Sequence, residues 1–330
     1  MSRPVEHDGV VFPRGGSKFL WISYRDKSGK RHRESTSTED QQEAHKILRT
    51  RLQARDDNVL QVIRSGESLT FGEWADFFLE NYSKPPVRQL GTHNANLRCL
   101  GHLKRAFVNC PLNGVGPDEI ELYLRERLRQ RVKVRTGKGY RELGLVKATT
   151  VHQELRVLRR VLNRAVRKRL LTSNPCAMVE FPVKVTGLFR PHYVTWSEQQ
   201  LIEDNARPHL RNAIRIIAET GLRAKKELLP MKKDQIDFLN EVLWIPDSKT
   251  PNGVAEIPLS KLASEAFRNQ IAISGNGEFL FPSDLNHQGH LTSLRTAWRK
   301  ALKRAGISYF RFYDLRSTYA TRLSGACQRL

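Results

Sequence analysis

The sequence has few cysteines, few aromatic residues, a shortage of acidic side chains and no long uncharged apolar run. Its four cysteines lie far apart and form no Cys-x-x-Cys pair, which argues against a disulfide scaffold and favours reduced thiols in an intracellular protein. Aromatic residues make up only 8% of the chain, but 39% of it is hydrophobic, which is enough to build buried cores. Because no apolar run reaches the thickness of a bilayer, we expect no membrane span.

Several motifs of cofactor-dependent enzymes are also missing. The ten histidines form no His-Glu-x-x-His pattern, and the pair His287 and His290 has no carboxylate or thiol at a suitable spacing. Neither a Gly-x-x-x-x-Gly-Lys-[Ser/Thr] loop nor a Gly-x-Gly-x-x-Gly loop occurs. The sequence therefore predicts neither a metal site nor a cofactor.

What the chain has in excess is positive charge. It holds 56 lysines and arginines against 34 acidic residues, a formal net charge of +22. The excess is uneven, with 13 basic and 10 acidic residues in 1–67, 21 and 10 in 68–180, and 22 and 14 in 181–330. Such an excess is typical of proteins that bind a polyanion, most often nucleic acid; a merely solvated basic surface is the alternative.

Residues 1–67 predict a small β-β(-β)-α unit. Residues 19–24 are rich in aromatic and β-branched side chains, Asp26 to Gly29 supply a turn, and residues 30–36 return as a polar strand. The sequence Thr38-Glu39-Asp40-Gln41 predicts a capping box that opens a helix. A polar sheet of this kind fits a groove of DNA, and a hairpin that only packs on the next domain is an equal alternative.

Residues 68–180 predict a helical domain. Helices are expected to begin at Thr70, where Glu73 completes a capping box, at Thr92, at Pro117 and at Thr150, the last running to about Arg169 before Asn174-Pro175. Leucines and aromatic residues recur in this domain at helical spacing and predict its core.

Basic side chains concentrate in two stretches of this domain. From Arg125 to Arg141 eight basic residues stand beside only two acids, Glu126 and Glu142. The last helix carries arginines that lack acidic partners four residues away, which favours phosphate contact over plain solvation. The candidate DNA-binding residues are Arg125, Arg127, Arg129, Arg131, Lys133, Arg135, Arg156, Arg159, Arg160, Arg164 and Arg167.

Residues 181–330 predict a domain of mixed α and β structure that follows a linker at 182–191. Thr195 to Glu198 predict a capped helix start, and further helices are expected near 207–220, 292–305 and 313–325. Strands at 242–246 and 254–258 are joined by Pro251-Asn252-Gly253, a strong hairpin signal. The whole chain is therefore expected to be multidomain and mainly α-helical, with small β-sheets.

Three clusters in this third segment carry side chains suited to chemistry. Glu219-Thr220-Gly221-Leu222-Arg223 places an arginine just after a helix-ending glycine. Asp247-Ser248-Lys249-Thr250 places a lysine beside the hairpin, and residues 312–321 place Arg316 early in a helix. Each cluster alone is typical of an ordinary helix end or turn, but their order and spacing together are specific.

In these clusters the chain resembles the tyrosine recombinase, or phage integrase, family. The signature of that family is a Thr-Gly-Leu-Arg helix junction, a hairpin lysine and a His-x-x-Arg box. The resemblance extends over the whole chain and implies three domains: an arm-type DNA-binding domain at 1–67, a helical, SAM-like core-binding domain at 68–180, and an α+β integrase-type catalytic domain at 181–330.

The resemblance implies roles for three residues. Arg223 and Arg316 would hold one scissile phosphate, since guanidinium forks bind phosphate oxygens and stabilise a pentavalent transition state. Lys249 would act as the general acid that protonates the leaving 5′ oxygen. The nucleophile of the family is a tyrosine that forms a phosphotyrosyl link, so neither metal nor ATP is required.

The sequence departs from the family pattern at three points. Tyr313 stands at the usual histidine position, where its hydroxyl can hydrogen-bond but cannot replace imidazole as a base near neutral pH. Lys226 stands where the family has an acidic residue, and Glu227 follows one step later. The sequence ends at Leu330, 14 residues beyond Arg316, so we expect a truncated catalytic domain without the nucleophile. Tyr319 falls where the family has a core aromatic residue.

The resemblance predicts a DNA-binding protein of a mobile element, associated with site-specific DNA recombination and integration. A catalytically inactive integrase fragment that only binds DNA or competes with an intact integrase is the alternative, so the sequence leaves enzymatic activity open. The expected partner is double-stranded DNA with attachment-like sites. The family oligomerises on DNA, whereas this chain is expected to be a monomer in solution, in the cytoplasm and associated with the nucleoid.

Overall fold

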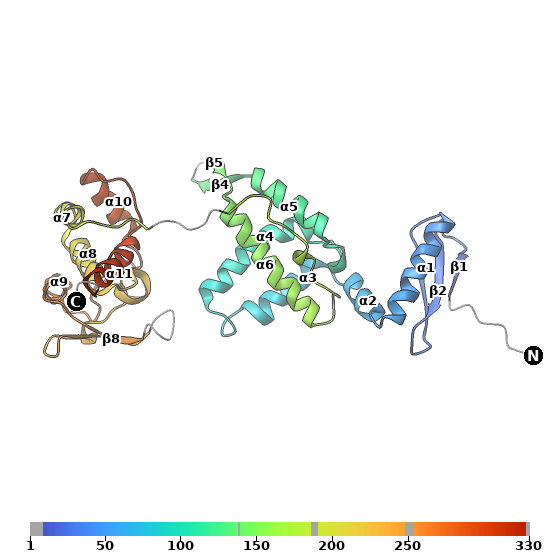
Figure 1. Ribbon diagram of the computed structural model, residues 1–330, viewed down its shortest axis with the longest axis horizontal. Coiled ribbons are helices and arrows are strands. Elements are labelled where there is room, and N and C mark those ends of the chain that lie inside the picture. The colour runs from blue at the N-terminus through green and yellow to red at the C-terminus, as the bar shows by residue number, and fades with distance from the viewer. Residues whose placement is uncertain (1–8, 138, 186–190, 248–253, 328–330) are drawn as a thin grey trace, which may run out of the picture. The chain divides into compact units, whose positions relative to one another are not determined.

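The computed structural model describes residues 9–137, 139–185, 191–247 and 254–327. The chain divides into two units, Met1–Gly187 and Leu188–Leu330, and each is described by itself (Figure 1). Helices predominate and the sheets are small and antiparallel, which confirms the expected fold class. Within the described ranges no helix is long and apolar enough to cross a bilayer.

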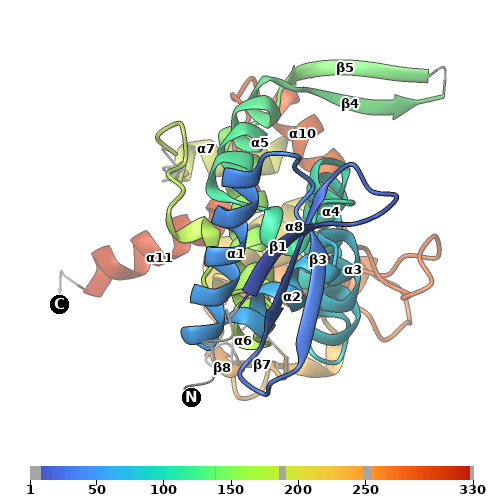
Figure 2. The same cartoon turned by 90° about the vertical axis from the view of Figure 1, so that its right-hand side faces the viewer.

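The first unit begins with a three-stranded antiparallel sheet in the order β1 (Gly9–Pro13), β2 (Leu20–Arg25) and β3 (Arg31–Ser35). In the central strand β2, Ile22 and Tyr24 are buried, and helix α1 (Gln41–Asp56) packs against the sheet through Leu48 (Figure 2). The two expected strands are confirmed as β2 and β3. The additional strand that the β-β(-β)-α pattern allowed is β1, which precedes them.

Helix α1 begins later than its predicted capping box. The N-cap is Asp40, whose carboxylate accepts a hydrogen bond from the Gln42 amide at 2.9 Å. Thr38 cannot take this place because its carbonyl accepts a hydrogen bond from the Leu20 amide and so belongs to the sheet. A further helix, α2 (Leu60–Ser68), was not predicted and adds Leu60 to the core of this sheet.

A helical bundle follows, built from α3 (Phe71–Phe78), α4 (Leu90–Phe107), α5 (Pro117–Arg129) and α6 (Ala148–Arg167). A π-helical turn, η1 (Leu79–Ser83), continues α3, and two 3₁₀ turns, η2 (Leu112–Gly114) and η3 (Pro175–Ala177), flank the later helices. The leucines and aromatic residues of these helices form one core, in which the Trp74 indole donates to the Val161 carbonyl at 3.1 Å.

Two of the four predicted helix starts in this bundle are confirmed and two are wrong. The Thr70–Glu73 capping box opens α3, and Pro117 is the first residue of α5. Helices α4 and α6 begin before Thr92 and Thr150, with Gln89 and Lys147 as N-caps. Neither threonine is needed as a cap, because its amide already donates to the carbonyl of that N-cap residue.

A two-stranded ribbon that sequence reasoning missed connects α5 to α6. Its strands β4 (Arg131–Thr136) and β5 (Gly139–Leu145) pair antiparallel, and every residue of both strands is exposed. The alternation of basic and β-branched residues from Arg131 to Arg135 has the period of a strand and could have predicted it. No strand is predicted here from the sequence, because the high density of charge conceals that alternation.

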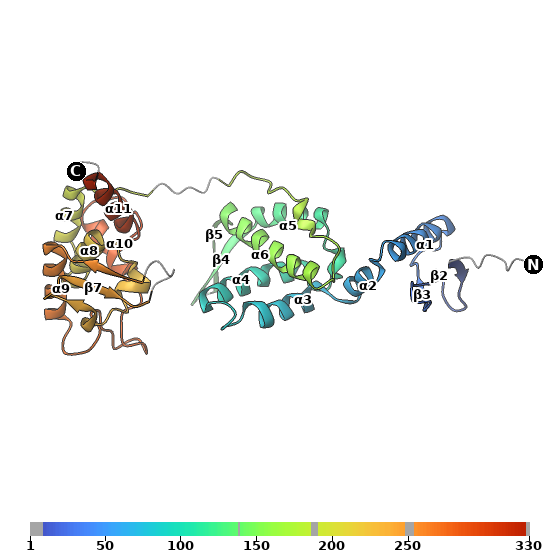
Figure 3. The ribbon, with the colours of Figure 1, turned by 60° about the horizontal axis from the view of Figure 1, so that its bottom comes forward.

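The second unit packs helices and one small sheet around a single core. Its helices are α7 (Trp196–Asp204), α8 (Pro208–Thr220), α9 (Lys261–Ile273), α10 (Arg295–Arg304) and α11 (Asp314–Cys327). The sheet has the order β6 (Ile236–Asp237), β7 (Val242–Ile245) and β8 (Ala255–Pro258), and Figure 3 shows it with the helices of this unit. The Thr195–Glu198 capping box and the pairing of β7 with β8 are confirmed. The predicted turn Pro251-Asn252-Gly253 lies outside the described residues.

One of the predicted DNA-binding arginines belongs instead to the core of the first unit. The guanidinium of Arg127 donates to the Glu154 carboxylate from both Nε and Nη2 at 3.1 Å, and the two side chains are only 9% and 1% exposed. Glu154 also accepts a hydrogen bond from the Tyr123 hydroxyl at 2.7 Å, and burial together with this carboxylate raises the pKa of Tyr123. Arg127 is therefore held by Glu154 within the first unit and is not extended into solvent like the other candidate arginines of α5.

Replacing Arg127 should destabilise the first unit. R127A leaves the Glu154 carboxylate buried without its charged partner, a loss of about 3–5 kcal/mol in the free energy of unfolding. The control R125A removes an exposed arginine that pairs with Glu121, and should cost about 0.5 kcal/mol or less. Hydrogen exchange of the α5 and α6 amides in the full chain measures the loss of stability in each variant. Equal protection in the two variants would contradict this assignment.

Candidate functional site

The predicted helix junction at Gly221 orients the first arginine of the site. Helix α8 ends at Thr220, and Gly221 adopts a left-handed conformation with φ of 66°. This reversal leads directly to Arg223, which is the N-cap of a π-helical turn, η4 (Ala224–Leu228). Glycine is required here because a Cβ on Gly221 would lie 2.4 Å from Cδ1 of Tyr319.

Glu227 is the centre of the site. Its carboxylate is 3% exposed and accepts two hydrogen bonds from Arg223, at 2.7 Å from the backbone amide and at 2.5 Å from Nη1. Residues four apart in a helical turn lie on the same face, and here the Glu227 amide also donates to the Arg223 carbonyl at 2.9 Å. The sequence has Lys226 where the family has an acidic residue. In the structure Glu227 faces Arg223 in its place, and Lys226 pairs with Asp247, just after β7.

Arg316 reaches the same carboxylate from the other end of the unit. It lies in the first turn of α11, with Nη1 3.9 Å from Oε2 of Glu227, and it donates a hydrogen bond to the Gly221 carbonyl. The structure thus brings together the two arginines that the sequence singled out. Their side chains are 23% and 32% exposed, so two guanidinium groups and one carboxylate form a site of net positive charge that solvent reaches.

The structure describes two of the three other residues that the sequence analysis discussed for this site. Lys249 lies outside the described residues. Tyr313 precedes α11 and is 54% exposed, and its carbonyl accepts the Arg316 amide at 3.0 Å, so it lies one turn from the site. The Arg311 guanidinium lies 6.0 Å from the Tyr313 ring. Tyr319 packs its ring against Gly221, which fits the core role expected for it.

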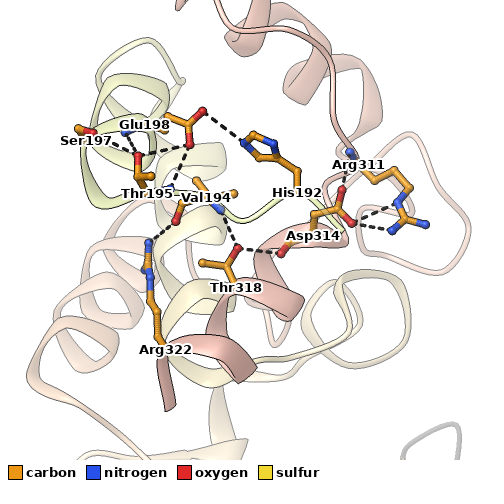
Figure 4. A network of polar contacts seen from close by, with 9 residues as sticks. All are labelled: His192, Val194, Thr195, Ser197, Glu198, Arg311, Asp314, Thr318 and Arg322. Carbon is orange, nitrogen blue, oxygen red and sulfur yellow. Dashed lines mark hydrogen bonds and ion pairs between the residues drawn. The ribbon is translucent and has the colours of Figure 1, made fainter. Parts of the chain in front are cut away.

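A polar network fixes the helix that carries Arg316 (Figure 4). The buried hydroxyl of Thr318 donates to the Asp314 carbonyl at 3.0 Å and accepts the Val194 amide at 3.0 Å. Arg322 donates to the Val194 carbonyl at 2.8 Å and stacks on Trp196, with Cζ 3.6 Å from the ring centroid. Asp314 is fully buried and accepts hydrogen bonds from Arg311. Helix α11 is therefore held to the segment just before α7, and Arg316 is held with it.

The other predicted DNA-binding residues lie at the surface of the first unit. Arg125, Arg129, Arg131, Lys133 and Arg135 are exposed at the end of α5 and along β4. On α6, Arg156, Arg159, Arg160 and Arg167 are exposed, and Arg164 is half-buried over the Tyr82 ring. Arg159 donates to the Cys176 carbonyl at 3.2 Å and Arg160 to Asn96 at 3.3 Å, so the fold holds parts of both side chains.

Sequence reasoning missed three groups that support the site. They are the buried Asp314, the Thr318 hydroxyl and the Arg322–Trp196 stack, which lie within or beside the helix starts at 195–198 and 312–321. The sequence shows these polar residues but not that they are buried, because a polar residue on an amphipathic helix is exposed far more often than it is buried.

Known proteins are similar to the part of the chain that carries this site. The phage integrase family model matches residues 196–326. The integrase of Salmonella phage P22 is 31% identical over 144 residues, which cover 39% of this chain and 37% of that protein. A XerC-like tyrosine recombinase of Caldanaerobacter subterraneus is 22% identical over 90% of this chain and 86% of its own length. The chain thus spans little more than a third of the P22 integrase in that match.

The fold is shared with a solved integrase. The structure of a lambda integrase dimer bound to a COC′ core site superimposes with a TM-score of 0.59 at 18% identity, over 97% of this chain and 88% of that one. The family model covers the helix junction and the start of α11, which carry Arg223, Glu227 and Arg316. Residues 196–326 thus match the phage integrase family, and the chain as a whole is similar to tyrosine recombinases.

The packing of Tyr319 on Gly221 gives a sharp mutational test. G221A introduces a clashing Cβ at a left-handed residue and should destabilise the second unit by about 2–4 kcal/mol. The matched control is G275A, because Gly275 has φ of 69° but no atom within 4 Å of the added Cβ, so it carries the backbone strain alone, about 1 kcal/mol. Thermal unfolding of the second unit separates the two. Equal losses in both variants would show that Tyr319 does not pack on Gly221.

Proposed function

We propose that this chain binds double-stranded DNA and that the site of Arg223, Glu227 and Arg316 holds one phosphodiester during site-specific recombination. The observation that carries this proposal is the convergence of two arginines, from helix ends far apart in the sequence, on one buried carboxylate. A solvent-accessible pair of guanidinium groups fits the two non-bridging oxygens of a phosphate.

The chemistry of the site follows from its charges. Glu227 offsets part of the repulsion between the two arginines and fixes the Arg223 side chain, so the pair is formed before a phosphate arrives. When a nucleophile attacks phosphorus, negative charge grows on the non-bridging oxygens, and preformed donors stabilise that charge without reorganising. By resemblance to the family, Lys249 protonates the leaving oxygen, and a tyrosine forms the covalent link. We assign that nucleophile to neither Tyr313 nor Tyr319.

We propose the same division of labour along the chain that the resemblance implies. Residues 1–67 would bind arm-type DNA sites through the β1–β3 sheet, residues 68–180 would bind the core site through α5, the ribbon and α6, and residues 181–330 would hold the phosphate. The basic surface of the second part supports this assignment. Such a protein would act wherever its DNA lies, in the cytoplasm of a bacterium and associated with the nucleoid.

A second function, binding without strand cleavage, uses the same surfaces and the same phosphate site. The comparisons favour recombination, because both curated relatives are named for it. The phosphate site is common to the two functions and is therefore the part to test first.

Removing one arginine of the site should weaken DNA binding in a way that reveals a lost phosphate contact. We expect R316A to lower affinity for duplex DNA about tenfold, the equivalent of one charged hydrogen bond of about 1.4 kcal/mol. The slope of log affinity against log salt should fall by about 0.9. Fluorescence anisotropy of a labelled duplex across a salt series measures both quantities.

The control for this experiment is R268A. Arg268 is an exposed arginine of α9 that stacks on Phe238, with Cζ 4.2 Å from the ring centroid, so its removal changes net charge equally but away from the site. R268A should leave affinity and salt slope within about a factor of two of the unmodified chain. Identical behaviour of R316A and R268A would contradict the proposed phosphate site.

A further inference from the structure

The β4–β5 ribbon contributes no buried residue of its strands to the core of the first unit. Every residue of its two strands is exposed. At its base, the Val146 amide donates to the Gln130 carbonyl at 2.9 Å. An exposed ribbon loses conformational freedom on folding and gains little burial in return, so its conformation is best explained by something that it contacts.

The ribbon overhangs a cationic cleft. The space between it and helices α4 and α6 is lined by four exposed cations, Arg105, Arg131, Lys133 and Lys147, and by a single carboxylate, that of Glu142. Lys133 and Glu142 face each other across the strands at 3.4 Å. The cleft is therefore positively charged on both of its walls, and it is open to an extended anionic chain.

The ribbon has the dimensions of an element that enters a groove of DNA. A six-residue strand such as β4 is about 20 Å long, and two paired strands with their side chains fit the major groove, which is about 12 Å wide. The register shifts by one residue between Arg131 and Lys133, a β-bulge, and bulges increase the right-handed twist with which a ribbon can follow a groove. Arg135 and Tyr140 pair directly across the strands near the tip and share one face.

We propose that the ribbon and the helical bundle straddle one sugar–phosphate backbone of a DNA duplex. In this arrangement the cleft cations contact phosphates, and the tip of the ribbon lies in the major groove, where Arg135 and Tyr140 contact base edges. The inference rests on the proposed function and extends it, because it makes the ribbon a determinant of sequence preference. The length of the ribbon limits its contacts to about six base pairs, at 3.4 Å of rise for each.

The experiment compares three variants of the full chain in a selection from duplexes with randomised sequence, followed by sequencing and anisotropy. In the first, residues 132–144 are replaced by Asn-Gly, a two-residue turn that joins the paired residues Arg131 and Leu145. The second is R135A/Y140A at the tip, and the third is R105A/K147A in the cleft. The control is V134T, which changes an exposed residue on the opposite face of β4 without changing charge.

The turn replacement should unfold at the temperature of the unmodified chain, because no residue of the ribbon is buried. We expect it and R135A/Y140A to lose preference over one run of about six base pairs, with at least a tenfold loss of affinity for duplexes selected by the unmodified chain. Substituting 7-deazaguanine within that run should reproduce the loss. R105A/K147A should weaken binding to all duplexes alike and lower the salt slope by about 1.8, and V134T should match the unmodified chain.

Other results would overturn the proposal. If ribbon replacement weakened all duplexes equally and left sequence preference intact, the ribbon would contact phosphates alone. If it changed no DNA-binding property, the ribbon would serve a protein partner. If the unmodified chain selected no duplex and bound none, the proposed function itself would fail, and that result is separate from one in which the chain binds DNA without using its ribbon.

Discussion

The buried carboxylate of Glu227 is the contact on which the site depends. Arg223 hydrogen-bonds this carboxylate and Arg316 lies 3.9 Å from it; the two guanidinium groups would otherwise repel each other, and the carboxylate lowers that cost. It accepts both the backbone amide and the side chain of Arg223, so it also fixes the direction in which that side chain points. The rest of the second unit can be understood as support for this one arrangement.

That support comes from two directions. The left-handed Gly221 ends α8 and turns the chain so that Arg223 faces the core, while the ring of Tyr319 closes against the glycine from α11. Elsewhere on α11, Thr318 and Arg322 bind the backbone of Val194. The helix cannot slide by a turn without breaking these hydrogen bonds, so Arg316 keeps its position relative to Glu227.

The sequence predicted the arginines of the site but not the group that joins them. Order and spacing singled out Arg223 and Arg316, since a glycine-terminated helix and a helix start are local features. Glu227 stands one residue after its expected position, and the structure shows that its carboxylate nevertheless faces both arginines. Arg127 shows the same limit, because its partner Glu154 lies on a different helix. The ribbon differs from these, because the alternation at residues 131–135 is local and could have predicted its first strand from the sequence alone.

One measurement tests the central claim directly, that Arg223 and Arg316 grip a single phosphate. Neutral methylphosphonate groups are placed one at a time along a duplex that the chain binds, and affinity is measured for the unmodified chain and for R223A/R316A. We expect one position at which the substitution costs the unmodified chain about tenfold and the double variant less than about twofold, the coupling of a direct contact. Equal losses in both proteins at every position would contradict the account.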